Sequence, residues 1–217
     1  MKLRHASPQE SRLLVYLSIL AMIGLQIAIS DKLTLGPKNL LAGLELILLC
    51  GAVLTHATGN PNLKHVKRTV SLLLIMVVTF TNIGSLGLVV GHLVDGSVVN
   101  GRSLLLSAVA IYITNILIFG LWYWEMDSPG LSGYQEPHRG PDFLFPQMTA
   151  RDVHPVLKNW VPSYFDYLYV SITNASAFSP TDALPLTTRT KTLMTIQSLS
   201  SFATVALVTA RAVNILK

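Results

Sequence analysis

The feature that most limits how this chain can fold is a set of long stretches without a charged side chain. They cover residues 13–30, 46–55, 71–94 and 103–124. A run of about 18 apolar residues is long enough, as a helix, to cross the hydrocarbon layer of a membrane. Only 12% of the 217 residues are charged, whereas a soluble domain has about 25%. The sequence therefore predicts an all-α, multi-pass membrane protein, with the lipid bilayer as its first partner.

The chain divides into three regions. Residues 1–124 contain four predicted transmembrane helices, at about 12–30, 39–57, 69–94 and 103–124. Residues 125–160 form a hydrophilic loop rich in Gly and Pro, and residues 161–217 contain a short apolar segment at 163–177, a polar break and a final helix from about 188 to 216. The short segment covers only about 22 Å as a helix, so it either spans or is re-entrant. The polytopic bundle accordingly has five to six transmembrane segments.

Lys and Arg residues between the apolar stretches indicate the orientation of the bundle. With the N-terminus inside, 11 of the 16 Lys and Arg residues lie on the inner side, whether or not the short segment spans. Because inner loops of membrane proteins are enriched in these residues, the count predicts a cytoplasmic N-terminus in the cell membrane. The net charge of +5 is spread over several loops, so it does not indicate nucleic-acid binding.

Ionisable residues inside the predicted spans are few, and each is a candidate for function because burying a charge in a membrane is costly. Glu45 lies about two turns into the second helix, among leucines. It is either a buried structural carboxyl, paired with His92 or Arg102, or a group that binds a proton or a cation. If the short segment spans, Asp166 and Arg211 meet near the inner interface, and we expect a structural ion pair between them.

The dipeptide Thr-Asn occurs three times, and its asparagines are Asn82, Asn115 and Asn174. An asparagine inside a membrane needs a hydrogen-bond partner and commonly holds helices together. The last helix offers such partners on one face, namely Gln197, Ser200, Ser201, Thr204 and Arg211. The pattern predicts either a polar contact between helices or a hydrophilic pathway through the bundle.

Sequence motifs of enzymes are missing. The chain has no HExxH, GxSxG or Walker motif and a single cysteine, so we predict that it is not an enzyme and needs no cofactor. The loop contains His138, Asp142, Asp152 and His154. Because they lack the regular spacing of ligands on one element, we interpret them as solvated loop residues and predict no metal site.

The C-terminal region resembles known membrane proteins through four sequence pieces: DFLFP at 142–146, DYLYVSIT at 166–173, AFSPTDALPL at 177–186 and ARAVNIL at 210–216. The chain is similar to a bacterial family of uncharacterised multi-pass membrane proteins that share this hairpin, which implies the bacterial inner membrane. Residues 163–217 also resemble the pore helix, filter and inner helix of potassium channels. Asn174, Ala175 and Ser176 stand where the channel has Gly-Tyr-Gly, and residues 171–191 contain no glycine. A potassium filter needs those glycines, so the resemblance implies a degenerate, non-selective pore loop.

Two functions follow from these patterns. The first is an ion-channel-like or small transport protein, a homo-oligomer that conducts a monovalent cation or a proton. Its pathway candidates are Thr173, Asn174, Ser176, Thr181, Asp182, Gln197 and Glu45. The alternative is a non-conducting structural or scaffold membrane protein, in which Asn82, Asn115, Asp166 and Arg211 serve only the packing of helices.

Overall fold

The fold was analysed in a computed structural model, which describes residues 8–57, 63–94, 101–128, 130, 140–150, 152, 157–158, 160–176 and 183–215. In this part of the chain the α-helices are α1 (Pro8–Ala28), α2 (Lys38–Ala57), α3 (Lys64–Val94), α4 (Gly101–Asp127), α5 (Pro146–Thr149), α6 (Tyr164–Ala175) and α7 (Thr188–Ile215). A 3-10 helix, η1 (Asp31–Leu33), follows α1, and the strands β1 (Phe143–Leu144) and β2 (Leu184–Pro185) form one antiparallel pair. The predicted all-α fold is confirmed.

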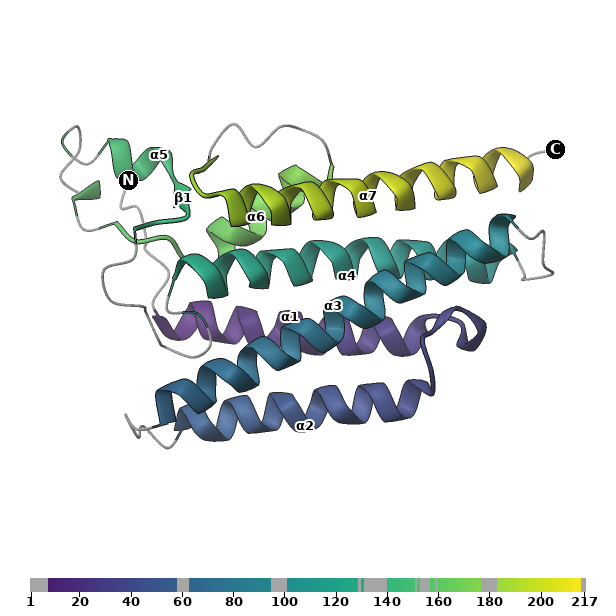
Figure 1. The fold of residues 1–217 in the computed structure, drawn as a ribbon, viewed down its shortest axis with the longest axis horizontal. Coiled ribbons are helices and arrows are strands. Elements are labelled where there is room, and N and C mark those ends of the chain that lie inside the picture. Colours follow the sequence, from purple (N-terminus) through teal and green to yellow (C-terminus); the bar gives the residue numbers. More distant parts are fainter. Residues whose placement is uncertain are drawn as a thin grey trace.

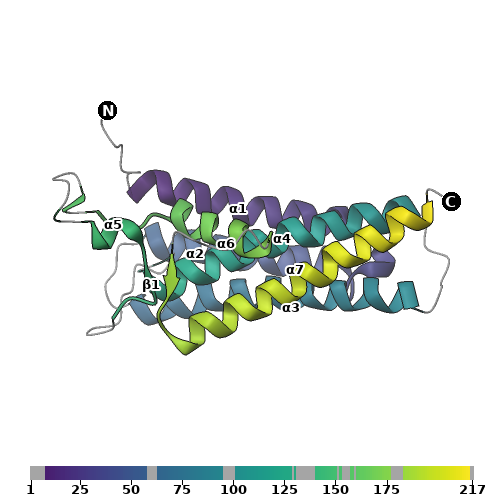
Figure 2. The ribbon, with the colours of Figure 1, turned by 90° about the horizontal axis from the view of Figure 1, so that it is seen from above.

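The five long helices α1, α2, α3, α4 and α7 lie side by side along one axis (Figure 1). We call the end at which α1 begins the proximal end and the opposite one the distal end. Helices α1, α3 and α7 run from the proximal to the distal end, whereas α2 and α4 run back. Figure 2, seen from above, shows the same alignment, with α7 crossing obliquely over its neighbours. The observed bounds lie within a few residues of the predicted ones.

Three helices are long and apolar enough to cross a membrane, at His65–Leu93, Gly101–Asp127 and Thr188–Ala210. Helices α1 and α2 contain shorter apolar stretches, Leu13–Ala28 and Asn39–Leu54. Large apolar side chains are exposed on the outside of the bundle, among them Ile47, Phe80 and Phe202. Such a surface suits lipid contact, because water would disfavour so much exposed apolar area. By length and composition, the predicted membrane character is confirmed for three of the described helices, α3, α4 and α7.

Helix α6 has only 12 residues, about 18 Å of helix. It begins at the proximal end of the bundle, where it packs against α4 and α7 (Figure 1). Beyond it, β2 pairs with β1 at the same end, with Phe143 opposite Pro185 and Leu144 opposite Leu184. The chain therefore enters the bundle along α6 and is back at the proximal end by residue 184, so the short segment does not traverse the bundle.

The start of α6 explains Asp166. Its carboxylate accepts hydrogen bonds from the backbone N–H and the hydroxyl of Ser163, both at 2.7 Å, which forms a capping box. Arg211 belongs to the last turns of α7, at the distal end (Figure 1). The expected Asp166–Arg211 pair is wrong, because it required α6 to span the bundle and α7 to return to the proximal end.

The proximal end holds an aromatic cluster. Phe143 and Phe145 flank the Tyr167 ring, with centroids 6.0 and 5.3 Å away. Phe143 also meets Tyr123 of α4 at 5.2 Å, and Phe145 meets Trp160 at 5.6 Å. All five side chains are buried. The loop after α4, which was expected to be hydrophilic, thus contributes β1 and α5. Its side chains Phe143 and Phe145 pack against Tyr167 and position the start of α6.

Candidate functional site

A cluster of polar side chains joins α4, α6 and α7, with Gln197 at its centre. The Gln197 amide nitrogen donates to the hydroxyl of Ser171 at 2.6 Å and to its carbonyl at 3.0 Å. The amide oxygen accepts from the Tyr123 hydroxyl at 2.6 Å and from the Asn174 amide at 2.8 Å. Gln197 is completely buried. Four hydrogen bonds to three neighbours leave no capacity of this side chain unused.

The two asparagines of this cluster are equally well paired. Asn115 donates to the Ser201 hydroxyl at 2.7 Å and accepts from Ser200 at 3.3 Å. Asn174 donates to the Met194 carbonyl at 3.0 Å and accepts from Ser198 at 3.1 Å. We call Tyr123, Ser171, Asn115, Asn174, Gln197, Ser198, Ser200 and Ser201 the α4–α6–α7 polar cluster. The predicted contact of the last helix with the Thr-Asn positions is confirmed for Asn115 and Asn174, whereas Asn82 donates to the Ile111 carbonyl of α4 instead.

The pathway candidates are distributed unevenly around this cluster. Asn174 and Gln197 are buried within it, so in one copy of the chain they lie in packed protein. Thr173 and Ser176 are half-buried at the end of α6, and each hydroxyl donates to a carbonyl of its own helix, Tyr169 at 3.0 Å and Ile172 at 2.7 Å. Thr181 and Asp182 lie outside the described residues.

Helices α4 and α6 approach each other closely at Gly120. A Cβ atom at this position would lie 3.2 Å from the Leu168 Cα atom, which is closer than side chains normally pack. Ser171, one turn further along α6, donates to the Ile116 carbonyl of α4 at 2.6 Å. The missing side chain at Gly120 therefore lets α6 sit against the α4 backbone and places Ser171 and Asn174 within reach of Gln197.

An ion pair anchors the proximal end. The buried Asp142 carboxylate receives two bonds from the Arg189 guanidinium, Nε at 2.9 Å and Nη2 at 2.8 Å, and a third from the Thr187 hydroxyl at 2.6 Å. The Asp142 N–H donates to Asp127, which also accepts from the Tyr167 hydroxyl at 2.7 Å. The interpretation of Asp142 as a solvated loop residue is wrong. This pair links the loop after α4 to the first turn of α7.

No group of three His, Cys, Asp or Glu side chains suited to a metal occurs among the described residues. His138 and His154, two of the four ionisable loop residues considered as ligands, lie outside that part of the chain. Asp142 uses both carboxylate oxygens on Arg189, so it is already neutralised. Where the structure describes the loop, it offers no metal site.

Glu45 lies in a different environment, between α1, α2 and α3. It is fully buried, and neither carboxylate oxygen has a hydrogen-bond partner among the described residues. The Gln26 amide lies next to the carboxylate without a hydrogen bond of normal geometry, and its nitrogen donates to the Thr81 hydroxyl at 2.6 Å. The expected pairing with His92 or Arg102 is wrong for this structure. The ring of His92 meets the Lys32 carbonyl instead, at 3.2 Å.

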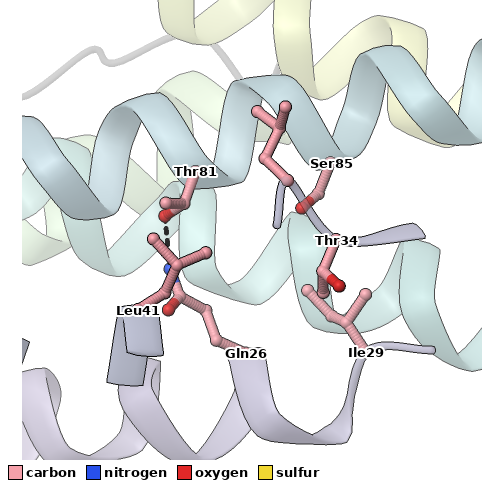
Figure 3. A pocket seen from close by; sticks show the side chains of 7 residues that line it. Gln26, Ile29, Thr34, Leu41, Thr81 and Ser85 are labelled. Atoms are coloured by element: carbon pink, nitrogen blue, oxygen red, sulfur yellow. Dashed lines mark hydrogen bonds between the residues drawn. The ribbon is translucent and has the colours of Figure 1, made fainter. Parts of the chain in front are cut away.

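A small pocket lies between α1, α2 and α3. It is lined by Gln26, Ile29, Thr34, Leu35, Leu41, Thr81 and Ser85 (Figure 3). Within it, the Gln26 amide nitrogen donates to the Thr81 hydroxyl, and Leu41, one turn before Glu45 on α2, lines the same pocket (Figure 3). On α3, Asn82 donates to the Ile111 carbonyl of α4 at 3.3 Å, while its amide oxygen has no partner in the described structure. This region thus leaves polar groups unpaired.

Sequence reasoning missed Tyr123, Ser171 and the Asp142–Arg189 pair. The sequence did offer a signal for the pair: Asp142 stands directly before an aromatic run, and Arg189 lies in the first turn of the last helix. Their contact joins residues 47 positions apart, however, which local patterns do not detect. Comparison with known proteins adds no further guide: no family model, no curated protein and no solved structure matches the chain. The site is therefore argued from its geometry alone.

Proposed function

We propose that the chain is an ion-channel-like or small transport protein of the bacterial inner membrane, belonging to the family whose hairpin it resembles. In this proposal the N-terminus is cytoplasmic, α1, α2, α3, α4 and α7 cross the membrane, and α6 is a re-entrant half-helix. One observation supports it above the others: α6 ends inside the bundle, and the chain returns to the end from which α6 started.

The electrostatics of a half-helix suit cations. The C-terminal turn of a helix carries a partial negative charge from its unpaired carbonyls. Half-helices that end inside a membrane protein place such dipole ends at ion sites. Thr173 and Ser176 lie in this turn of α6, and we propose that they form the mouth of the pathway with Thr181 and Asp182. Without glycines in this segment, potassium selectivity is not part of the proposal.

The pathway is proposed to run between copies of the chain. Asn174 and Gln197 are buried within the polar cluster, and their amides are hydrogen-bonded to other described residues of the same copy. The outer face of α7 is apolar and exposed at Leu199, Phe202 and Val205. A homo-oligomer that covers part of this face brings several α6 ends together around one axis, as symmetric assemblies of identical chains do.

Reconstitution into liposomes tests the proposal. We expect flux of a monovalent cation or protons, and a change in its rate or selectivity in the variants Thr173→Val and Ser176→Ala. Thr209→Val is the matched control, since Thr209 is exposed near the distal end of α7 and its hydroxyl bonds within the helix at 2.9 Å. Vesicles that stay silent to monovalent cations, anions and protons contradict the proposal.

The alternative function is a non-conducting membrane scaffold, and the completeness of the polar cluster supports it. The side-chain hydrogen bonds of Gln197 and Asn115 link α4, α6 and α7 to one another. For a scaffold we expect Asn115→Leu to lower the resistance to unfolding in detergent while no transport activity exists to be altered. Oligomers that form without any ion flux favour this function over the first.

A further inference from the structure

We propose that the proximal end of α2 and α3 is a binding site for an anionic phospholipid, whose phosphate group pairs with the Lys67 ammonium. The last turn of α2 and the first turn of α3 lie side by side at this end of the bundle (Figure 1). The inference rests on the membrane topology of the proposed function, which brings the proximal end to a bilayer surface. It does not rest on conduction through α6, because binding alone tests it.

Lys67 is a buried cation without a counter-ion in the part of the chain that the structure describes. It is only 9% exposed, and none of the described residues forms a hydrogen bond or an ion pair with its side chain. A buried ammonium is unfavourable unless an anion or several hydrogen-bond acceptors accompany it. A negatively charged ligand at this position supplies the partner that the described residues do not.

Helix geometry directs the Lys67 ammonium to the proximal end. Lys67 is the first member of the buried stripe of α3, which continues with Ser71, Leu74, Ile75 and Val78. It lies three residues after the start of the helix, about 4.5 Å along the axis. Because side chains of a helix lean toward its N-terminus, the Lys67 side chain runs toward the proximal end. Its apolar stem therefore packs in the bundle, and its charged group lies at the rim.

The positive charge of Lys67 adds to that of its surroundings. Helix α3 begins with the residues KHVKR, and its described first turn contains no acidic residue. The N-terminus of a helix itself carries a partial positive charge from its unpaired N–H groups, which disfavours cations and favours anions such as phosphate. Clusters of Lys and Arg next to a membrane helix attract anionic lipids for the same reason. The start of α3 thus combines a phosphate-binding helix end with a lysine that needs an anion.

An apolar surface for acyl chains adjoins the charged end. Gly51 of α2 lies opposite Val70 of α3, because a Cβ atom on Gly51 would be 3.7 Å from the Val70 Cγ1 atom. The two helices run in opposite directions, so Leu54, three residues beyond Gly51, is level with Lys67. Leu54 is 66% exposed and Val66 is 47% exposed. Free phosphate uses only the charge of this site, whereas a phospholipid uses the charge and the apolar surface together, so the site favours the lipid.

Thermal unfolding of the full chain in a neutral detergent tests the site. Dioctanoyl phosphatidylglycerol is compared with dioctanoyl phosphatidylcholine, which has the same acyl chains without net charge, and with glycerol phosphate, which has no acyl chains. We expect the wild-type midpoint to rise saturably with phosphatidylglycerol, on the order of 2–4 °C, and to change little with the other two. Lys67→Met keeps the stem and removes the charge, so the apparent affinity should fall on the order of fivefold. Lys191→Met removes an exposed charge at the same end and should retain the wild-type affinity.

A second variant, Val66→Glu, leaves the buried lysine in place. Val66 is exposed in the first turn of α3, where a carboxylate suits the helix but competes with the phosphate group, so we expect weaker binding of phosphatidylglycerol. An equal wild-type response to phosphatidylcholine or to glycerol phosphate overturns the proposal, and so does an unchanged affinity in Lys67→Met. Should Lys67→Met fail to fold, an unchanged affinity in Val66→Glu overturns the proposal as well. Absence of ion flux in liposomes contradicts the proposed conduction and leaves this inference intact, because the measurement detects lipid binding.

Discussion

The two polar regions of the bundle contain the same kinds of side chains but differ in how completely these side chains are hydrogen-bonded. In the α4–α6–α7 polar cluster, Gln197 forms four hydrogen bonds to its neighbours. Between α1, α2 and α3, Gln26 forms a bond to Thr81 but leaves the carboxylate of Glu45 unpaired. A complete set of bonds fixes helices in one arrangement, whereas an incomplete set leaves room for a ligand.

The two regions also differ in what packs against a glycine of each region. At Gly120 the obstacle to a larger side chain includes the backbone of α6, 3.2 Å from a Cβ atom. At Gly84 the obstacle is the end of the flexible Leu35 side chain. Backbone cannot yield without moving a helix, whereas a partly exposed side chain can rotate. A larger side chain is therefore expected to be accommodated more easily at Gly84 than at Gly120. Four comparisons between variants test this contrast.

The largest effect is expected at the proximal ion pair. Arg189→Ala leaves the buried Asp142 carboxylate without its cation, and we expect the free energy of unfolding to fall by about 3 kcal/mol. Chemical unfolding in mixed micelles measures it. Lys191→Ala, which removes an exposed positive charge two residues away, is the control and should change little. Equal effects of the two variants contradict the role given to the ion pair.

The next largest effect is expected at the centre of the polar cluster. Gln197→Leu keeps the volume but removes the partner of Tyr123, Ser171 and Asn174. We expect a loss of about 2 kcal/mol in the same assay, since each lost contact inside a membrane bundle costs about 1 kcal/mol. The control is Thr195→Val, whose hydroxyl bonds only within α7, at 2.8 Å. A loss below that of Thr195→Val shows that the cluster is not what holds α6 in place.

In the pocket region the expected sign is reversed. Glu45→Gln removes a buried carboxylate that has no hydrogen-bond partner among the described residues, so we expect a gain of about 1 kcal/mol. The opposite exchange in the polar cluster, Asn115→Asp, introduces such a charge and should cost about 2 kcal/mol. Unfolding curves of both variants under identical conditions give the comparison. A destabilised Glu45→Gln means that the carboxylate has a structural partner after all.

The smallest difference is expected between the two glycines. Gly120→Val overpacks the contact with the α6 backbone, and we expect a loss of about 2 kcal/mol. Gly84→Val displaces only the Leu35 side chain, and we expect less than about 1 kcal/mol. Matched unfolding curves give the difference. If Gly84→Val costs as much as Gly120→Val, then the loop that carries Leu35 is as firmly packed against α3 as α6 is against α4.

The long helices could be predicted from the sequence because uncharged runs of sufficient length have few alternatives to a membrane helix. The same reasoning found the polar face of α7, since Gln197, Ser201 and Thr204 recur at helical spacing and are all buried. It also found that Glu45 has no local partner. These features depend on residues close together in the chain, which periodicity can detect.

Contacts between distant segments could not be predicted in this way. Asp166 was assigned to Arg211 because each was a charged residue in an apolar segment, whereas its partner is Ser163, three residues before it. Asp142 was interpreted as a solvated residue because it belongs to the Gly- and Pro-rich loop. Its contact with Arg189 follows from the return of the chain after α6, and the length of that short segment alone left the choice between spanning and re-entrant open.

The central claim is that the chain enters the bundle along α6 and is back at the same end of the bundle by residue 184. Val161 and Leu184 flank this passage and are 73% and 58% exposed. In a Cys50→Ser background, each is replaced by cysteine and treated with a membrane-impermeant maleimide, in right-side-out and inside-out vesicles. We predict that Val161→Cys and Leu184→Cys are both labelled from the side that bears the N-terminus. Labelling of the two cysteines from opposite sides means that the segment spans the membrane and contradicts the account.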